Sequence, residues 1–448
     1  MRYKYFLYLL LPWFLFADVE VRLKTDLDLK PMYLSRIATD PTQIDWRYFE
    51  ELRTVLECDL QTGGFATVLP IQEDIEQTFR WPEVKRNFDL TFWKRAKIPF
   101  VTTVGIFSNS IQVTVFNIEK GSSKRYPALP ITHKLEEDRK QLHAIADSIH
   151  KDLFGSKGIA SLRLIYSQRS KSLSSDWISE IWINDFDGAN ALQATFENSY
   201  CINPAFYHGT ARQDNPSFFF ISYKQGQSKI YRSSLHATTS EPVIDLRGNH
   251  ALPSLNKTGS QMAFIADTAG RPDLFIQNFD PFGKTLGKAR QLYSTPRATQ
   301  ASPTFSPDGS TIAFVSDKDG PPRIYTIAVA SPKETRRQVP QLLTKKNREN
   351  TSPAWSPNGK KLAYSAKVDG IRQIWIYDFD TEEEMQLTTG PENKENPAWA
   401  PNSLHLVYNT DNEEEGQLFL INLHQKEPIQ ITKGAGQKRF ASWETRGP

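Results

Sequence analysis

The sequence predicts an α+β chain in which a small α/β N-terminal domain precedes an all-β six-bladed β-propeller closed by the C-terminal strand. Two observations carry this prediction: a repeat with a period of about 50 residues, and strand-like segments at the same offsets in each copy. We expect residues 1–17 to form a signal peptide and residues 18–157 the N-terminal domain, with a flexible arm at 18–30. Residues 158–448 then form the propeller.

The repeat is clearest around a proline that precedes an aromatic residue. Three segments read SPTFSPDG (302–309), SPAWSPNG (352–359) and NPAWAPNS (396–403), and weaker copies lie around Pro204 and Pro253. The prolines of the five copies are spaced by 49, 50, 50 and 44 residues. A period in this range with strand-like content is typical of propeller blades.

Each copy predicts a short antiparallel sheet. In the copy around Pro303, an inner strand is followed by a type I turn at 306–309, with serine first, proline second and glycine fourth. Strands at 311–316, 323–327 and 341–344 complete the sheet. The next two copies predict strands at 361–365, 373–377 and 385–388, and at 405–409, 417–421 and 429–432.

The carboxyl end supplies an inner strand that the first blade lacks. Residues 162–167, 180–184 and 191–195 look like three strands of a blade, but no inner strand precedes them. Residues 439–443 look like an orphan inner strand, with Trp443 placed 44 residues after Trp399. Pairing the two ends removes exposed sheet edges, which a stack of independent hairpins would leave open. We therefore predict a closed ring of six blades.

The region before the repeat predicts the α/β domain. Residues 19–23 alternate like a strand, and 46–60 have the apolar spacing of a helix that ends at Gly63. Strands are expected at 101–107 and 111–118, and a helix over 135–154.

The first residues are typical of a secretory signal peptide. Arg2 and Lys4 precede an apolar run at 6–16, and Ala17 is the expected cleavage site. The run is shorter than the roughly 20 residues that span a membrane, although a retained anchor is the alternative. We expect a mature monomer in an extracytoplasmic space, where Cys58 and Cys201 remain two separate buried thiols.

Composition and motifs exclude several function classes. The 54 Lys and Arg residues against 51 Asp and Glu give a net charge of +3 and no basic stripe, which argues against nucleic acid as a partner. The chain lacks a Gly-x-Ser-x-Gly elbow, a phosphate-binding loop and a dinucleotide fingerprint. His143 and His150 are better explained as half-buried histidines than as metal ligands. We expect no catalytic residue, metal or cofactor.

Polar residues lead into the predicted inner strands, which converge on one mouth of the central channel. A ring rich in hydrogen-bonding groups suits a protein or peptide partner, although a water-filled channel also needs polar walls. The candidate contact residues are Tyr200, His250, Thr299, Gln300, Glu349, Asn350, Glu395, Asn396, Lys438 and Arg439.

Three features combine in this chain: the Pro-x-Phe/Trp-Ser-Pro-Asp/Asn-Gly frame, Asp59-Leu60 followed by Gly63-Gly64-Phe65, and the link from Phe154-Gly155 through 158–160 into the ring. Together they resemble the TolB family, periplasmic components of the Tol-Pal cell-envelope system. The resemblance covers essentially the whole mature chain. It implies binding and not catalysis.

The resemblance implies two protein partners. The mouth would receive the peptidoglycan-associated lipoprotein (Pal), which associates the protein peripherally with the outer membrane. This link would support envelope integrity and outer-membrane constriction during cell division. The N-terminal arm would engage the inner-membrane protein TolA, although it lacks the glycine-containing stretch typical of the family. The arm residues concerned are Asp18, Val19, Glu20, Val21, Arg22 and Leu23.

The alternative is a secreted propeller enzyme that acts on polysaccharide, as a lyase or glycosidase. In that case Glu349 and Glu395 would act as acids, and His250 and Lys438 as bases, at the channel mouth.

Overall fold

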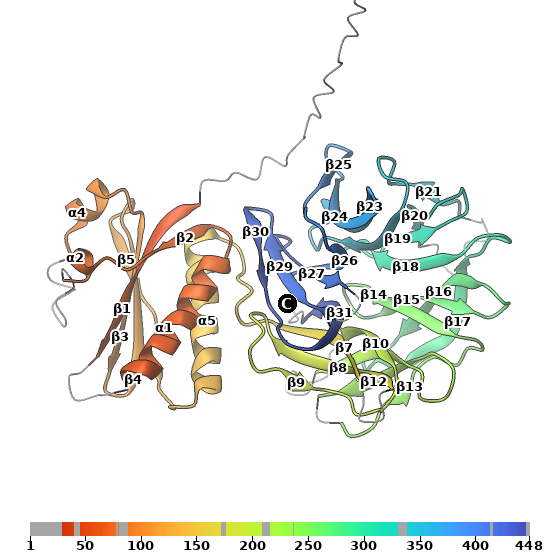
Figure 1. Cartoon of the computed structure of the whole chain (residues 1–448), viewed down its shortest axis with the longest axis horizontal. Helices are drawn as coiled ribbons and strands as arrows, with labels where there is room; N and C mark the ends of the chain where they lie inside the picture. Colours follow the sequence, from red (N-terminus) through yellow and green to blue (C-terminus); the bar gives the residue numbers. More distant parts are fainter. Residues whose placement is uncertain are drawn as a thin grey trace, which may run out of the picture.

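A computed structural model describes residues 29–39, 45–77, 79, 88–171, 176–207, 216–235, 237–329, 338–412 and 415–444. These form an N-terminal domain of sheet and helices beside a six-bladed propeller (Figure 1). The expected signal peptide with its cleavage site at Ala17, and the arm residues 18–23, lie outside the described residues and stay predictions. In the described part of the chain, none of the helices has the length and apolar character needed to span a bilayer.

The N-terminal sheet has the strand order β2-β1-β3-β4-β5, with β6 pairing with β4. Strand β1 pairs in parallel with both β2 and β3, and β3 and β4 form an antiparallel hairpin. The strands predicted at 101–107 and 111–118 are confirmed as β3 and β4, whereas β1 and β2 were missed. The strands are β1 (Lys30–Thr39), β2 (Ala66–Leu69), β3 (Phe100–Phe107), β4 (Ser110–Asn117), β5 (Ser122–Arg125) and β6 (Leu129–Pro130).

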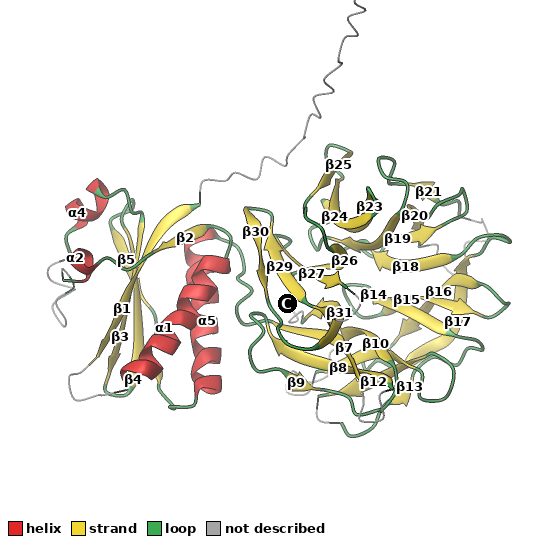
Figure 2. Cartoon of the chain, viewed as in Figure 1, coloured by secondary structure: helices red, strands yellow, loops and turns green. Residues whose placement is uncertain are grey.

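Two long helices cover the face of this sheet that looks toward the propeller (Figure 2). They are α1 (Trp46–Thr62) and α5 (Leu135–Phe154), and both were predicted. Gly155 ends α5 in the left-handed conformation at φ 73°, which glycine adopts without strain. The short helices α2 (Glu73–Glu76) and α4 (Leu90–Arg95) lie on the other side of the domain, beside a smaller aromatic core.

Five blades are formed by consecutive antiparallel strands, each blade beginning with its inner strand. Every strand predicted from the repeat is present. Blade 2 contains β10 (Cys201–Tyr207), β11 (Ser217–Ser222), β12 (Lys229–Ser234) and β13 (Glu241–Pro242); blade 3 contains β14 (His250–Leu255), β15 (Gln261–Asp267), β16 (Pro272–Phe279) and β17 (Thr285–Tyr293). Blade 4 contains β18 (Gln300–Phe305), β19 (Thr311–Ser316), β20 (Arg323–Ala328) and β21 (Gln341–Leu342); blade 5 contains β22 (Asn350–Trp355), β23 (Lys361–Val368), β24 (Ile371–Asp378) and β25 (Glu383–Gln386). Blade 6 contains β26 (Asn393–Trp399), β27 (His405–Asp411), β29 (Leu418–Asn422) and β30 (Gln425–Gln430).

Blade 1 combines both ends of the propeller and confirms the predicted closure. Its inner strand is β31 (Gly436–Trp443), followed by β7 (Arg163–Lys171), β8 (Trp177–Asp185) and β9 (Leu192–Gln193). Strand β31 pairs antiparallel with β7, and the short β28 (Glu415–Gly416) pairs with β31 in parallel. The indole of Trp443 is 3% exposed, and its Nε1 donates to the carbonyl of Ala398 in blade 6 at 3.1 Å.

The repeated proline has a structural reason. Each inner strand carries a bulge: in β18, Gln300 and Ala301 pair with β19, the next two residues do not, and pairing resumes at Thr304. The second bulge residue is proline in five blades, where a missing N–H breaks no ladder hydrogen bond. The first bulge residue has a φ between 45° and 55° in all six blades. These first residues are Asn203, Leu252, Ser302, Ser352, Asn396 and Phe440.

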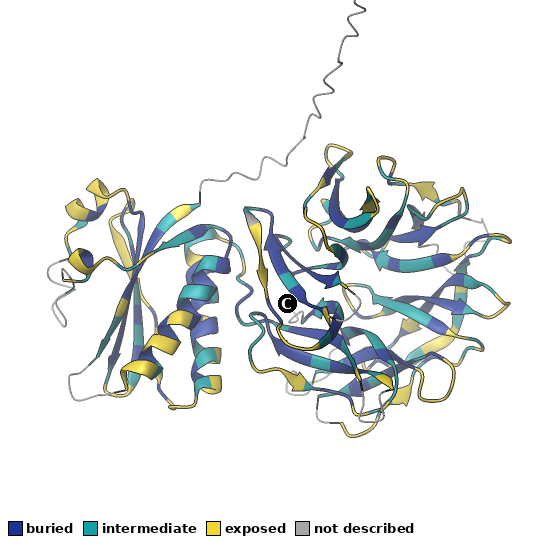
Figure 3. Ribbon diagram, viewed as in Figure 1, coloured by how far each residue is buried: buried dark blue, intermediate teal, exposed yellow. Residues whose placement is uncertain are grey.

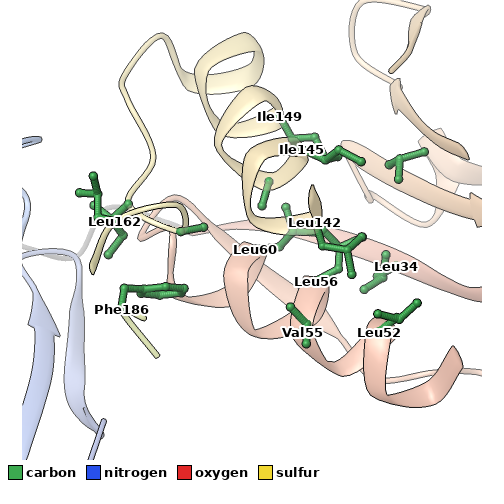
Figure 4. Packing of buried hydrophobic residues seen from close by; sticks show 14 of the residues in the cluster. Leu34, Leu52, Val55, Leu56, Leu60, Leu142, Ile145, Ile149, Leu162 and Phe186 are labelled. Carbon is green, nitrogen blue, oxygen red and sulfur yellow. The ribbon is translucent and has the colours of Figure 1, made fainter. Parts of the chain in front are cut away.

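A continuous apolar core joins the two domains. Figure 4 shows Leu56 and Leu142 of the helices in the same cluster as Leu162, which precedes β7, and Phe186, which follows β8 in blade 1. In Figure 3 most of α5, the helix beside the propeller, is drawn in the buried and intermediate colours. His405 Nε2 donates to the carbonyl of Thr62 at 2.6 Å, so the propeller also holds the end of α1.

The two cysteines are free thiols, as predicted. Cys58 lies on α1 and Cys201 begins β10. Burial raises the pKa of Cys58 to about 12 and also raises the pKa of Cys201, so both thiols stay protonated at neutral pH.

Candidate binding surface at the propeller mouth

The mouth face is the side of the ring on which the inner strands begin. Neighbouring inner strands contact one another around the ring, so residues at the same register form circles on this face. Three successive circles matter, and we call them entry, first and second positions. The entry positions are Tyr200, Asn249, Thr299, Glu349, Asn393 and Gln437; the first positions are Cys201, His250, Gln300, Asn350, Lys394 and Lys438; the second positions are Ile202, Ala251, Ala301, Thr351, Glu395 and Arg439.

The first positions are buried in all six blades. His250 Nε2 donates to the carbonyl of Leu246 at 2.9 Å, and Lys438 Nζ donates to carbonyls of the loop before β31, including that of Gly434 at 2.6 Å. Asn350 and Gln300 bind their own entry loops in the same way. Burial lowers the pKa of His250 to about 4 and lowers the pKa of Lys438.

The structure therefore corrects part of the sequence analysis. We expected His250, Gln300, Asn350 and Lys438 to face the mouth, but their side chains are turned into the protein and hold the loops that enter each blade. The reason is the alternation of side chains along a strand, which turns residues one position apart to opposite sides.

Glu349, Glu395 and Arg439 belong to a charged network that crosses blades 5, 6 and 1. The guanidinium of Arg372 lies between the two glutamates: its Nε is 3.0 Å from Glu395 Oε1, and its Nη2 is 3.8 Å from Glu349 Oε2. Lys367 Nζ is 3.5 Å from the same oxygen of Glu349. Arg439 forms an ion pair with Asp411 of β27. Burial raises the pKa of Glu395, and the nearby Arg372 opposes that rise. The network is half-buried, so its charges remain accessible to a partner.

The other expected residues also differ in their surroundings. Asn396 is a bulge residue whose side chain bridges blades, accepting from Ser352 Oγ at 3.0 Å. Thr299 is exposed, and its backbone N–H is bound by the carboxylate of Asp317 at 2.7 Å. Tyr200 is half-buried, with its ring 5.9 Å from that of Tyr223.

The structure adds mouth residues that the sequence analysis missed. In every blade the second strand ends on this face, opposite the entry position, and we call these residues the rim positions. Examples are Arg169 opposite Gln437 and Asp411 opposite Asn393. The sequence analysis considered only the starts of inner strands, but hairpin pairing brings the strand ends to the same face. The rim positions are Arg169, Tyr223, Asp267, Asp317, Lys367 and Asp411.

A second polar cluster lies at the junction between the domains, away from the mouth. Asp59 of α1 and His143 of α5 are buried, with Oδ2 and Nδ1 2.8 Å apart, and Asp187 follows β8. Within the described residues this is the one group of three side chains spaced so that a metal ion could bind. Asp187 is already paired with Arg139, and His143 is already paired with Asp59, so the cluster balances its charge internally.

Comparison with known proteins decides the family. Residues 150–446 match the family model described as the TolB beta propeller domain. The chain belongs to the TolB family. A TolB homolog of Protochlamydia amoebophila is 41% identical over 380 residues, which cover 84% of this chain and 81% of the relative. A TolB homolog of Chlamydia felis is 39% identical over 286 residues, covering 63% of this chain and 61% of the relative.

The fold of the TolB family extends over both domains. The crystal structure of TolB from Acinetobacter baumannii superposes with a TM-score of 0.74 at 20% sequence identity, covering 93% of this chain and 96% of that chain. TolB-family proteins are periplasmic components of the Tol-Pal system, and membership places this chain in the same class.

Proposed function

We propose that this protein is a binding scaffold that holds the peptidoglycan-associated lipoprotein at its mouth face. Through that lipoprotein it would associate peripherally with the outer membrane and support envelope integrity and constriction during division. One observation supports this most strongly. Accessible charged and aromatic side chains gather on a single face, over blades 5, 6, 1 and 2, on a rigid closed ring. Such a mixed polar and aromatic surface is typical of protein interfaces.

The N-terminal arm is proposed as the segment that engages TolA. It precedes β1, a strand that is already paired in parallel on both sides at its start. Arm residues Val19, Val21 and Leu23 would add a strand to an edge of the partner's sheet. Deleting residues 18–28 should abolish capture of TolA and leave capture of the lipoprotein intact.

The geometry does not favour the alternative of a polysaccharide lyase or glycosidase. His250 and Lys438 are buried, and His250 Nε2 and Lys438 Nζ donate to backbone carbonyls, so neither side chain reaches the mouth to act as a base. Glu349 and Glu395 both form ion pairs with Arg372, so their carboxylate oxygens are already engaged within the chain. Binding therefore explains the mouth better than catalysis.

A pull-down with the soluble domain of the organism's own lipoprotein tests the proposal. Glu349→Lys combined with Arg439→Glu should abolish binding, because two of the network's charges are inverted. Glu241→Lys is the matched control, since Glu241 is exposed on β13, the outer strand of blade 2. Unchanged binding by the double variant would rule out the network as part of the interface, and turnover of envelope polysaccharide by the wild type would favour the enzyme.

A further inference from the structure

Arg169 holds its guanidinium over an aromatic ring at the mouth face. It is the rim residue of blade 1, at the end of β7, and its Cζ lies 4.3 Å from the ring centroid of Trp177 and 5.9 Å from that of Tyr200. Its hydrogen bonding is sparse: Nη1 donates to Gln437 Oε1 at a long 3.4 Å, and Nε has no partner among the described residues. The neighbouring rings hold the guanidinium in place, and most of its donors make no hydrogen bond within the described residues.

This arrangement differs from that of the two arginines in the charged network. Arg372 and Arg439 each contact a carboxylate of this chain, so their charges are already neutralised. Arg169 forms no ion pair with any carboxylate in the part of the chain that the structure describes. The charge of Lys171 adds to that of Arg169, because Lys171 Nζ lies 5.3 Å from the same Trp177 ring. Blade 1 therefore presents unneutralised positive charge where blades 5 and 6 present a balanced network.

Exposed aromatic surface surrounds this charge. Trp177 is 39% exposed and Tyr223 is 42% exposed, although large aromatic side chains in a soluble protein are usually covered. Tyr223 contacts Tyr200, so the rings form one surface over blades 1 and 2. A guanidinium backed by aromatic rings is preorganised and partly desolvated, which strengthens its hydrogen bonds to an anion.

We propose that Arg169 is a carboxylate-binding anchor of the mouth face, and that its occupant is an acidic side chain on a partner protein. The planar fork matches the two oxygens of a carboxylate, and residues flanking that acid would cover Trp177 and Tyr223. The inference rests on the proposed function, because it specifies the chemistry of the same lipoprotein partner. It assigns the strongest single contact to blade 1, outside the network of Glu349 and Arg439.

The test is a calorimetric titration of the mature protein with the soluble lipoprotein domain. Arg169→Ala should weaken binding about 10- to 100-fold, as interface hot spots do. Arg169→Lys should recover only part of that loss, because lysine keeps the charge but not the fork. Arg323→Ala is the matched control: Arg323 is half-buried at the start of β20, on the same face but in blade 4, and its removal should change affinity by less than about 2-fold.

Each acidic residue of the partner is then replaced in turn with its amide. One of these replacements should weaken binding to the wild type but should not weaken binding to Arg169→Ala any further. Equal affinities for the wild type and Arg169→Ala would overturn the inference, as would equal losses for Arg169→Ala and Arg323→Ala. The inference would also be wrong if Arg169→Ala weakened binding to peptidoglycan fragments but left binding to the lipoprotein unchanged, because that result would indicate a glycan site.

A second measurement separates this inference from the proposed function. The Arg169 Nε–H resonance of the mature protein is followed while an acetylated Leu-Glu-Leu amide, or its Leu-Gln-Leu counterpart, is added. A shift with the glutamate peptide alone supports the carboxylate site even if the wild type fails to bind the lipoprotein, in which case only the proposed function is wrong. No shift with either peptide, together with no effect of Arg169→Ala on the lipoprotein, would refute the site itself.

Discussion

Replacing Trp443 with alanine should destabilise the ring at its point of closure. The indole is 3% exposed in the core shared by blade 1, blade 6 and the N-terminal domain, and Nε1 donates to the carbonyl of Ala398 at 3.1 Å. Removing a buried tryptophan costs about 3–5 kcal/mol, and the lost hydrogen bond leaves a carbonyl unpaired. We expect a loss of about 4–5 kcal/mol in the free energy of unfolding.

Thermal unfolding followed by circular dichroism measures this loss. At roughly 2 °C per kcal/mol for a large domain, the Tm should fall by about 8–10 °C. Trp443→Phe keeps most of the packing and loses the hydrogen bond, so it should cost far less. Trp399→Ala is the matched control, because Trp399 makes the equivalent bond to the carbonyl of Ala354 at 3.1 Å but lies within one continuous blade.

Limited proteolysis tests the role of closure itself. Trp443→Ala should expose the chain end at β31 to protease well below the Tm, whereas Trp399→Ala should not. A fall in Tm of less than about 2 °C, or identical proteolysis of the two variants, would refute the argument that Trp443 secures the closing strand.

Two further changes test the turns and the domain junction. Gly248→Ala should lower the free energy of unfolding, measured by chemical denaturation, by several kcal/mol more than Gly226→Ala. Both glycines have φ near 80°, but a Cβ at Gly248 would lie 1.7 Å from the carbonyl oxygen of Asp267, whereas nothing lies within 4 Å at Gly226. Equal losses in the two variants would contradict this reasoning. Burial raises the pKa of Asp59 to about 6. Burial opposes charge on His143, but the hydrogen bond that His143 donates to Asp59, together with the negative charges of Asp59 and Asp187, outweighs burial and raises the pKa of His143 too. The folded pair thus binds protons more tightly than the unfolded chain, so its contribution to stability is complete below about pH 4 and is lost as the pH rises through and above 6. Relative to Asp59→Asn, the wild type should lose about 1–3 kcal/mol between pH 5 and pH 8 in urea titrations, and parallel pH profiles would exclude the pair as the cause.

The fold could be predicted because the repeat is encoded by backbone geometry. A proline after a left-handed residue marks the bulge of five inner strands, and the spacing of these prolines gives the blades. Strand β31 lacks the proline, with Phe440 followed by Ala441, yet Trp443 still marked it because its indole occupies the same site as that of Trp399. Strand β1 was missed because it is buried between β2 and β3 and shows no alternation of polar and apolar residues.

The mouth could be predicted only as a region. Sequence spacing located where inner strands begin, but not which residue of each start faces outward, so buried His250 and accessible Glu349 were grouped together. Arg169 was missed because its significance depends on Trp177 across the β7–β8 hairpin, a pairing that strand content alone does not specify.

The pairing of β31 with β7 also sets the order in which the protein can fold. Trp443 pairs with Leu164, 279 positions earlier in the chain, so this contact closes the longest loop in the propeller. Closing so long a loop carries a large entropic cost, and contacts of this kind form late. The blades made of consecutive strands can form as the chain emerges, but the ring stays open until β31 arrives. The six blades therefore become one closed unit only after β31 has been made and has paired with β7.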